Sequence, residues 1–113
     1  MISKDTIDKV FEFSRVEEVI SDFIALKKSG ANYKGLSPFT NEKTPSFVVS
    51  PSKQIWKDFS SGKGGNVIAF LMEHEQFNYP ESIRYLANKY NIEIIETEET
   101  AENVEERNER ESL

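Results

Sequence analysis

The stretch that decides the fold runs from Tyr33 to Asn66 and reads YKGLSPFTNEKTPSFVVSPSKQIWKDFSSGKGGN. It contains two short corners, Ser37-Pro38-Phe39-Thr40 and Asp58-Phe59-Ser60-Ser61-Gly62. Each corner places two small polar side chains three positions apart, and 17 residues separate the first pair from the second. Two tight turns of this kind bring paired side chains toward one point, as the two halves of a structural metal site do.

The spacing is that of a zinc ribbon, but the residues at the four ligand positions are not zinc ligands. These positions hold Ser37, Thr40, Asp58 and Ser61, and the chain contains no cysteine. Hydroxyl groups bind zinc poorly, and one carboxylate cannot hold the ion against water. We therefore expect an α+β fold, a zinc-ribbon-like small antiparallel sheet flanked by helices, without bound zinc.

We expect the four positions to meet in space even without an ion, because the strands of a ribbon bring both corners to the same end. Asp58 would then accept hydrogen bonds from the neighbouring hydroxyl groups and turn amides. Phe39 and Phe59 are expected to pack beside the corners. The alternative is four separate, solvated loop residues.

The residues around the corners resemble the N-terminal zinc-binding domain of bacterial DNA primase. The resemblance rests on residues 33–51, 53–59 and 62–67, and it extends from about residue 4 to about residue 95. In that family the first corner reads Cys-Pro-Phe-His and the second reads Cys-Phe-Gly-Cys. This chain departs from the family pattern at all four ligand positions and at little else.

The resemblance implies the template-binding domain of a DNA primase, which engages single-stranded DNA for RNA primer synthesis in DNA replication. It also implies that a Toprim-type polymerase domain, a nucleotidyltransferase that binds divalent metal, follows in a longer protein. We expect residues 1–95 to form the ribbon-like domain and residues 96–113 to form an acidic linker. The implied partners are the template, the remaining primase domains and, through the full-length protein in a primosome, the replicative helicase.

The residues by themselves provide no catalytic centre. The chain has one histidine, His74, and no cysteine, so it offers no pair of a nucleophile and a base. His74 is expected to be a surface or packing residue, and this stretch alone is not expected to be an enzyme. The first residues do not form a signal peptide and no apolar run could span a membrane, so we expect a cytoplasmic location without membrane contact.

The net charge of −6 is distributed unevenly along the chain. Residues 93–113 hold nine acidic residues and two arginines, a balance of −7, so residues 1–92 carry +1. Residues 27–63 hold seven lysines and two acidic residues, a balance of +5. A basic segment attracts nucleic-acid phosphates in a salt-dependent way, although the summed charge alone would argue against such a partner.

We expect template contact on one face of the strands. Six residues are predicted to contact DNA: Lys34, Lys43, Lys53, Trp56, Lys57 and Lys63. Phe59, Tyr33 and Phe47 could also offer rings for base stacking, but Trp56 and Phe47 could instead face the core. The competing hypothesis is a non-catalytic interaction module of a primase-like protein that has lost both zinc and DNA contact.

Apolar residues at helical spacing predict helices near residues 3–13, 14–23, 67–73 and 80–90. Ser3 and Asn66 are expected to cap the first and third of these helices. The sequence Ser14-Arg15-Val16-Glu17 has the form of a capping box for the second helix. The third helix is apolar nearly all round and should therefore be the most buried.

Short runs between turn residues predict the strands. The expected segments are residues 24–28 and 31–35 as a hairpin, residues 46–49 and 54–57, and an edge strand at 92–94. We interpret Gly62-Lys63-Gly64-Gly65 as a tight turn before the third helix, with a phosphate contact at Lys63 as the alternative.

Overall fold

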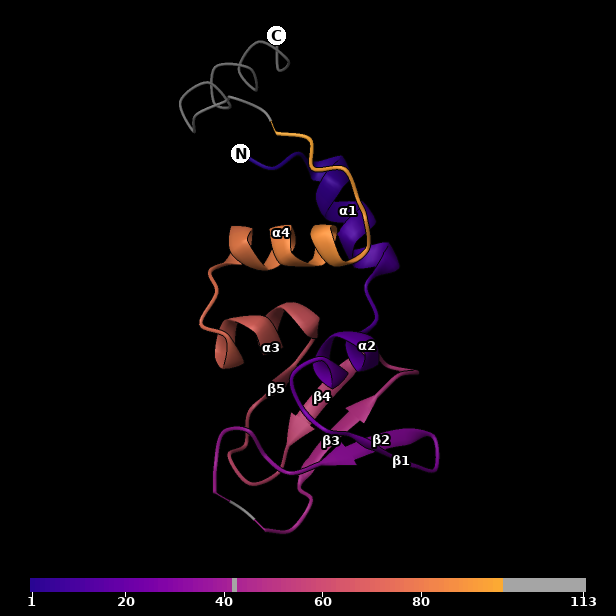
Figure 1. Cartoon of the computed structure of the whole chain (residues 1–113), viewed down its shortest axis with the longest axis vertical. Coiled ribbons are helices and arrows are strands. Elements are labelled where there is room, and N and C mark those ends of the chain that lie inside the picture. Colours follow the sequence, from indigo (N-terminus) through magenta and orange to yellow (C-terminus); the bar gives the residue numbers. More distant parts are fainter. Residues whose placement is uncertain (42, 97–113) are drawn as a thin grey trace, which may run out of the picture.

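The computed structural model describes residues 1–41 and 43–96, which form a five-stranded antiparallel sheet and four helices (Figure 1). The elements are, in chain order, α1 (Lys4–Phe13), α2 (Val16–Ser21), β1 (Lys27–Ser29), β2 (Asn32–Gly35), β3 (Phe47–Ser50), β4 (Ile55–Asp58), β5 (Gly64–Gly65), α3 (Val67–His74) and α4 (Tyr79–Lys89). The strand order in the sheet follows the chain order. The predicted α+β class is confirmed, and the predicted acidic linker lies outside the described residues except for Glu96.

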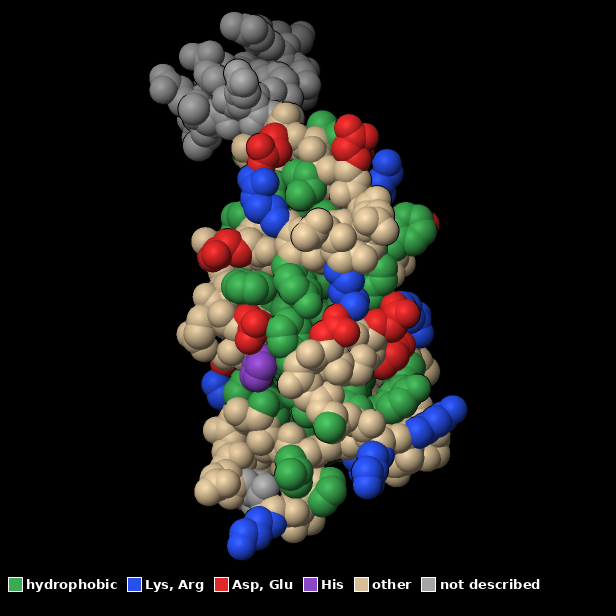
Figure 2. All heavy atoms as spheres, viewed as in Figure 1, with side chains coloured by type: hydrophobic (Ala, Val, Ile, Leu, Met, Phe, Trp, Pro, Cys, Tyr) green, Lys and Arg blue, Asp and Glu red, His purple; other side chains and the backbone are tan. Residues whose placement is uncertain are grey.

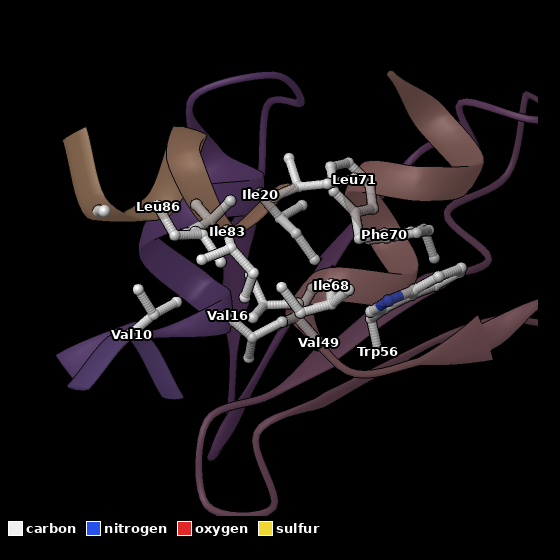
Figure 3. Close-up of a cluster of buried hydrophobic side chains, with 14 of the residues drawn as sticks. Val10, Val16, Ile20, Val49, Trp56, Ile68, Phe70, Leu71, Ile83 and Leu86 are labelled. Atoms are coloured by element: carbon white, nitrogen blue, oxygen red, sulfur yellow. The ribbon is translucent and has the colours of Figure 1, made fainter. Parts of the chain in front are cut away.

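All the helices lie on one side of the sheet and form layers (Figure 1). α2 packs on β3, α3 packs on β4 and β5, α4 lies against α3, and α1 lies against α4. The core fills the space between these layers, and there Trp56 from the sheet packs against Phe70 from α3 (Figure 3). Within the described residues, no helix has the length and apolar character needed to cross a membrane.

Alternation along the strands divides the sheet into an inner and an outer face. In β3 and β4 the buried positions are Phe47, Val49, Trp56 and Asp58, and the residues between them are more exposed. Because successive side chains of a strand point to opposite faces, the outer face must consist of the intervening residues. The helices therefore cover one face of the sheet and leave the other open.

The ends of three helices are capped by their own side chains. Ser3 accepts a hydrogen bond from the amide of Thr6 at 3.2 Å, and Asn66 accepts one from the amide of Ala69 at 2.9 Å, as predicted. Asn78 caps α4 with a full capping box. These side chains satisfy amide groups that have no partner inside the helix.

The capping box predicted at Ser14 is wrong. α2 begins at Val16, the position before it is Arg15, and no side chain of that position caps the helix. The hydroxyl of Ser14 is buried and has no hydrogen-bond partner among the residues that the structure describes. Gln54, from the turn between β3 and β4, accepts the hydrogen bond from the Val16 amide at 2.9 Å instead. A tertiary contact has thus replaced the local cap.

Two strand predictions also need correction. Gly64 and Gly65, interpreted as a turn, form β5 and pair with Lys57 and Trp56 of β4. The edge strand predicted at residues 92–94 is absent, and the chain there makes a single bridge between Ile2 and Glu96. Local sequence could not show that β4 offers a free edge to the glycines, because that pairing is tertiary.

Candidate nucleic-acid interface

The two corners meet at one end of the sheet. Ser37 follows β2, and Asp58 is the last residue of β4, so both lie beside Phe47, the first residue of β3. The Asp58 side chain is completely buried. Antiparallel order thus brings together residues that are 21 positions apart.

Asp58 holds the corners together through its two carboxylate oxygens. The hydroxyls of Ser37 and Ser61 each donate to Oδ2 at 2.6 Å. Oδ1 accepts from the hydroxyl of Ser60 at 3.1 Å, from its amide at 3.3 Å, and from the Ser46 hydroxyl at 3.5 Å. The predicted cluster is confirmed, and Ser60 and Ser46 are members that sequence reasoning missed.

Thr40 joins the cluster indirectly. Its hydroxyl lies 2.6 Å from that of Ser60, and because the Ser60 proton is directed at Asp58, Thr40 is the donor. Ser37 also accepts hydrogen bonds from the amides of Phe39 and Thr40, which shapes the first corner. All four former ligand positions therefore belong to one hydrogen-bonded network.

The hydrogen bonds keep Asp58 ionised. Burial by itself raises the pKa of this carboxyl group, but the hydroxyls of Ser37, Ser61 and Ser60 and the Ser60 amide stabilise the charged form and lower the pKa below its ordinary value of 3.8. A buried carboxylate with this many donors does not need a cation as a partner.

The four positions do not fit a zinc ion. They provide one carboxylate and three hydroxyls, whereas structural zinc sites use thiolates and imidazoles. Both carboxylate oxygens already accept hydrogen bonds. Among residues 1–41 and 43–96, no group of three or more histidine, aspartate or glutamate side chains could hold a metal ion.

The aromatic residues of the two corners have different environments. Phe39 packs 5.6 Å from the ring of Trp56 and 6.2 Å from that of His74, as predicted for a residue beside the corner. Phe59 is 69% exposed, so the prediction that it packs there is wrong. His74 stacks on Phe70 at 5.0 Å, which confirms its interpretation as a packing residue.

The outer face of the sheet carries a row of residues that includes three lysines. The register pairs Lys27 with Lys34, Lys34 with Val48, Val48 with Lys57, and Lys57 with Gly64. Directly paired residues point to the same side of a sheet. Lys34 and Lys57, two of the predicted DNA contacts, therefore share one open face. Lys27, which was not among the predicted contacts, lies on the same face.

A hollow of about 310 Å³ lies on this face, along β3, β4 and the turn between them. Lys53, Lys57, Ile55 and Phe59 line it, and no acidic side chain does so within the described residues. Phe59 follows β4 in phase with Ile55 and Lys57, and its ring is available to solvent. Phe59 is therefore the aromatic ring that this face presents.

Trp56, in contrast, is a core residue. It is 1% exposed, lies on the inner face, and stacks on Phe47 with ring centres 5.5 Å apart. Its indole nitrogen donates to the carbonyl of Asn66 at 2.8 Å. The prediction that Trp56 lies on the DNA-facing strand face is thus wrong, because the alternation of β4 directs position 56 inward.

The other predicted lysines are spread around this face. Lys53 lies in the turn between β3 and β4, and Lys43 lies in the loop between β2 and β3, so antiparallel order places them at opposite ends of the strands. Lys63 forms an ion pair with Glu73 at 2.6 Å, which partly neutralises it. In the view of Figure 2, acidic side chains gather over the helices, and the part formed by the strands shows basic ones.

Comparison with known proteins agrees with this architecture. Residues 2–103 match the family model of the DnaG zinc ribbon, described as the CHC2 zinc finger. The chain belongs to the CHC2 zinc-finger family. Although the family is described as a zinc finger, this CHC2 domain has no cysteine at any of the four ligand positions.

Relatives of the CHC2 domain are bacterial primases. It is 47% identical over 94 residues to the DNA primase of Clostridium acetobutylicum, covering 83% of this chain and 16% of that protein. It is 42% identical over 118 residues to the DNA primase of Listeria monocytogenes, covering 92% of this chain and 19% of that one. The chain thus spans less than a fifth of the length of these relatives.

A solved structure resembles the CHC2 domain across most of its length. This is the crystal structure of the zinc-binding and RNA polymerase domains of the Aquifex aeolicus primase, with a TM-score of 0.74 and 36% identity. The match covers 87% of this chain and 24% of that one. The fold of a primase zinc-binding domain is therefore present here, with a hydrogen-bonded aspartate at the position of a metal ligand.

Proposed function

We propose that this CHC2 domain binds the single-stranded DNA template for a DNA primase, which makes RNA primers in DNA replication. The observation that carries the proposal is the open outer face of the sheet, where Lys34, Lys57 and the exposed ring of Phe59 occur together. Lysines neutralise phosphates and an exposed ring stacks on bases, a combination typical of proteins that bind single strands.

The arrangement of Lys57 supports the same function. Its ammonium group donates to the carbonyl of Gly62 at 3.0 Å, so the second corner holds the side chain in position. Within the described residues it forms no ion pair with an acid. A positioned, unpaired ammonium group keeps its charge available for a phosphate.

We also propose that the domain works without zinc, with the Asp58 network in place of the ion. It would work together with further primase domains, reached through the acidic linker of residues 96–113, and one of these domains would bind divalent metal and carry out nucleotide transfer. The replicative helicase would be reached only through the full-length protein, in the cytoplasm. The coverage of the longer primases supports this arrangement.

The test is binding of a fluorescent oligothymidylate at several salt concentrations. The wild-type domain should bind with a negative slope of log K against log salt. The double variant Lys53→Ala/Lys57→Ala should bind more weakly, and its slope should be shallower by about 0.7 for each lost phosphate contact. Lys4→Ala/Lys9→Ala, which removes two exposed lysines of α1, should bind like the wild type.

The competing hypothesis, an interaction module without DNA contact, predicts a different result. In that case the wild-type domain would show no salt-dependent affinity for the oligonucleotide. Equal affinities of the wild type and Lys53→Ala/Lys57→Ala at every salt concentration would exclude this face as the DNA-binding surface.

A further inference from the structure

A second, larger concavity lies at the β1 edge of the sheet. It has a volume of about 650 Å³, within the usual range for small-molecule sites. Phe23, Ile24, Leu36 and Pro38 form its apolar walls. Leu36 is 49% exposed although it is a large apolar residue, so the cleft presents apolar surface to solvent.

The floor of the cleft is fixed by tight packing. Gly35 at the end of β2 allows the segment after α2 to approach, since a Cβ atom there would meet the carbonyl oxygen of Ala25 at 2.8 Å. The Phe23 ring lies 5.7 Å from that of His74 and 6.0 Å from that of Phe70. The part of the wall formed by Phe23 and Ile24 is therefore preformed and packs against the core of the domain.

The rim of the cleft is positively charged. Lys27, Lys28 and Lys34 line it, and no acidic side chain does so in the described part of the chain. None of the three lysines takes part in an ion pair among the described residues. An apolar interior with an unpaired cationic rim is complementary to a ligand that has a flat apolar part and a negative charge, as a nucleotide has.

The cleft shares two residues with the outer face of the sheet. Lys27 and Lys34 are directly paired across β1 and β2, and both belong to the row that ends at Lys57 and to the rim of the cleft. A strand whose phosphates follow this row would arrive at the cleft. The lysine row thus favours a nucleotide of the bound strand over a free nucleotide or an acidic peptide.

We propose that the cleft at the β1 edge binds one unstacked base of the single-stranded DNA, with the neighbouring phosphates at Lys27, Lys28 and Lys34. This inference rests on the proposed DNA-binding function and adds a specific base site to it. The base would lie between the walls formed by Ile24 and Leu36. Removing that base from the DNA would remove the contact and leave the phosphates in place.

The experiment moves a single abasic nucleotide along a short oligothymidylate and measures the affinity for each position. One position should lose roughly 5- to 100-fold in affinity, the range for loss of one stacked base. In Leu36→Ala, an abasic nucleotide at that position should lower affinity no more than at any other position. The affinity of this variant for the intact strand should fall by a similar factor. Phe11→Ala, which truncates an apolar residue of α1 that is 43% exposed, is the matched control and should behave like the wild type.

Charge is tested with Lys28→Ala, because Lys28 lines the cleft but does not belong to the lysine row of the outer face. This variant should lower the salt slope and should reduce affinity for intact and abasic strands alike, and Lys9→Ala is its control. Thymidine monophosphate should compete only at concentrations far above those of the oligonucleotide. Competition at equal concentration would assign the cleft to free nucleotides and overturn the inference.

Failure of this inference can be told apart from failure of the proposed function. If the intact strand binds and Lys53→Ala/Lys57→Ala weakens binding, but no abasic position is special and Leu36→Ala changes nothing, the base site is wrong and the DNA-binding face remains. If the wild type binds no oligonucleotide, both are wrong, and an acidic peptide becomes the better match for the cleft.

Discussion

Asp58 occupies the position of a metal ligand and joins the two corners by accepting hydrogen bonds. Structural zinc in small fingers contributes about 10–16 kcal/mol, whereas one hydrogen bond to a charged group contributes about 1.5–3 kcal/mol. The Asp58 network therefore replaces only part of such a term. The remainder has to come from the core, where Phe39, Phe47 and Trp56 pack directly behind the corners.

Replacing Asp58 by alanine should destabilise the domain strongly. The variant loses the two bonds of 2.6 Å and leaves the hydroxyls of Ser37 and Ser61 without their acceptor. We expect the free energy of unfolding to fall by about 3 kcal/mol or more, measured as a lower urea midpoint. Asp8→Ala, at an exposed position of α1, is the control. An unchanged midpoint in Asp58→Ala would contradict the structural role of the network.

The same network predicts a dependence on pH. Because hydrogen bonds lower the pKa of Asp58 below 3.8 in the folded protein, its contribution to stability is complete above the pKa of the unfolded chain. The contribution is lost as the pH falls through the lower pKa of the folded state. Urea midpoints of wild type and Asp58→Asn should therefore differ most at neutral pH and converge in acid. A constant difference between the two curves would show that the charge of Asp58 does not matter.

The sequence predicted this site better than it predicted the aromatic residues around it. The two corners and their spacing were sufficient to predict that Ser37, Asp58 and Ser61 lie close together, because the strands of a ribbon place both corners at the same end of the sheet. Ser60 could have been found from the tendency of aspartate to bond the amide two residues ahead. The exchange of roles between Trp56 and Phe59 depends on which face of β4 is covered, which only the packed helices decide.

At the scale of elements, one glutamine connects the sheet to the helical layer. Gln54 accepts from the amide of Val16, and its nitrogen donates to Glu17 at 2.9 Å and to the carbonyl of Pro51 at 2.6 Å. It sits in the left-handed region with φ of 55°. One side chain thus caps α2 and closes the turn between β3 and β4. No local signal in residues 14–17 could reveal a cap that comes from residue 54.

Gln54→Ala should therefore lower the free energy of unfolding more than the same substitution at a comparable glutamine. Loss of an N-cap costs about 0.5–2 kcal/mol, and the turn loses a further bond to Pro51. Gln76 is the matched control, since it also has a positive φ, of 60°, but within the described part of the chain its side chain donates only to the carbonyl of Glu73. In thermal unfolding, the midpoint temperature should fall further in Gln54→Ala than in Gln76→Ala. Equal losses would mean that backbone conformation, rather than capping, explains the effect.

At the scale of the whole molecule, the layered arrangement leaves one face of the sheet free and uses the other for the core. α2 and α3 pack on the inner face, and α4 and α1 lie beyond α3, so the positions available to a partner are the outer residues of β2, β3 and β4. Sequence patterns predicted the helices and four of the strands. They could not predict β5, because two glycines carry no strand preference and pair only where β4 offers an edge.

The fold should be independent of zinc. Protein purified without chelator should contain no stoichiometric zinc by elemental analysis, and EDTA should leave its thermal midpoint unchanged. The physical reason is that three hydroxyls and one saturated carboxylate make a poor site for the ion. A content of about one equivalent of zinc, or a midpoint that falls with EDTA, would contradict this prediction.

The hydrogen-bonded corners also change how this domain responds to oxidants. A turn closed by zinc and thiolates can be opened when a sulfur is oxidised, because sulfenic acid and disulfide no longer bind the ion as thiolate does. The hydroxyls of Ser37 and Ser61 and the carboxylate of Asp58 do not undergo that chemistry, and the chain has no cysteine at all. Peroxide or disulfide stress that would unfold a thiolate ribbon should therefore leave these corners closed, and the strands that they join should stay in register when the cellular redox balance shifts.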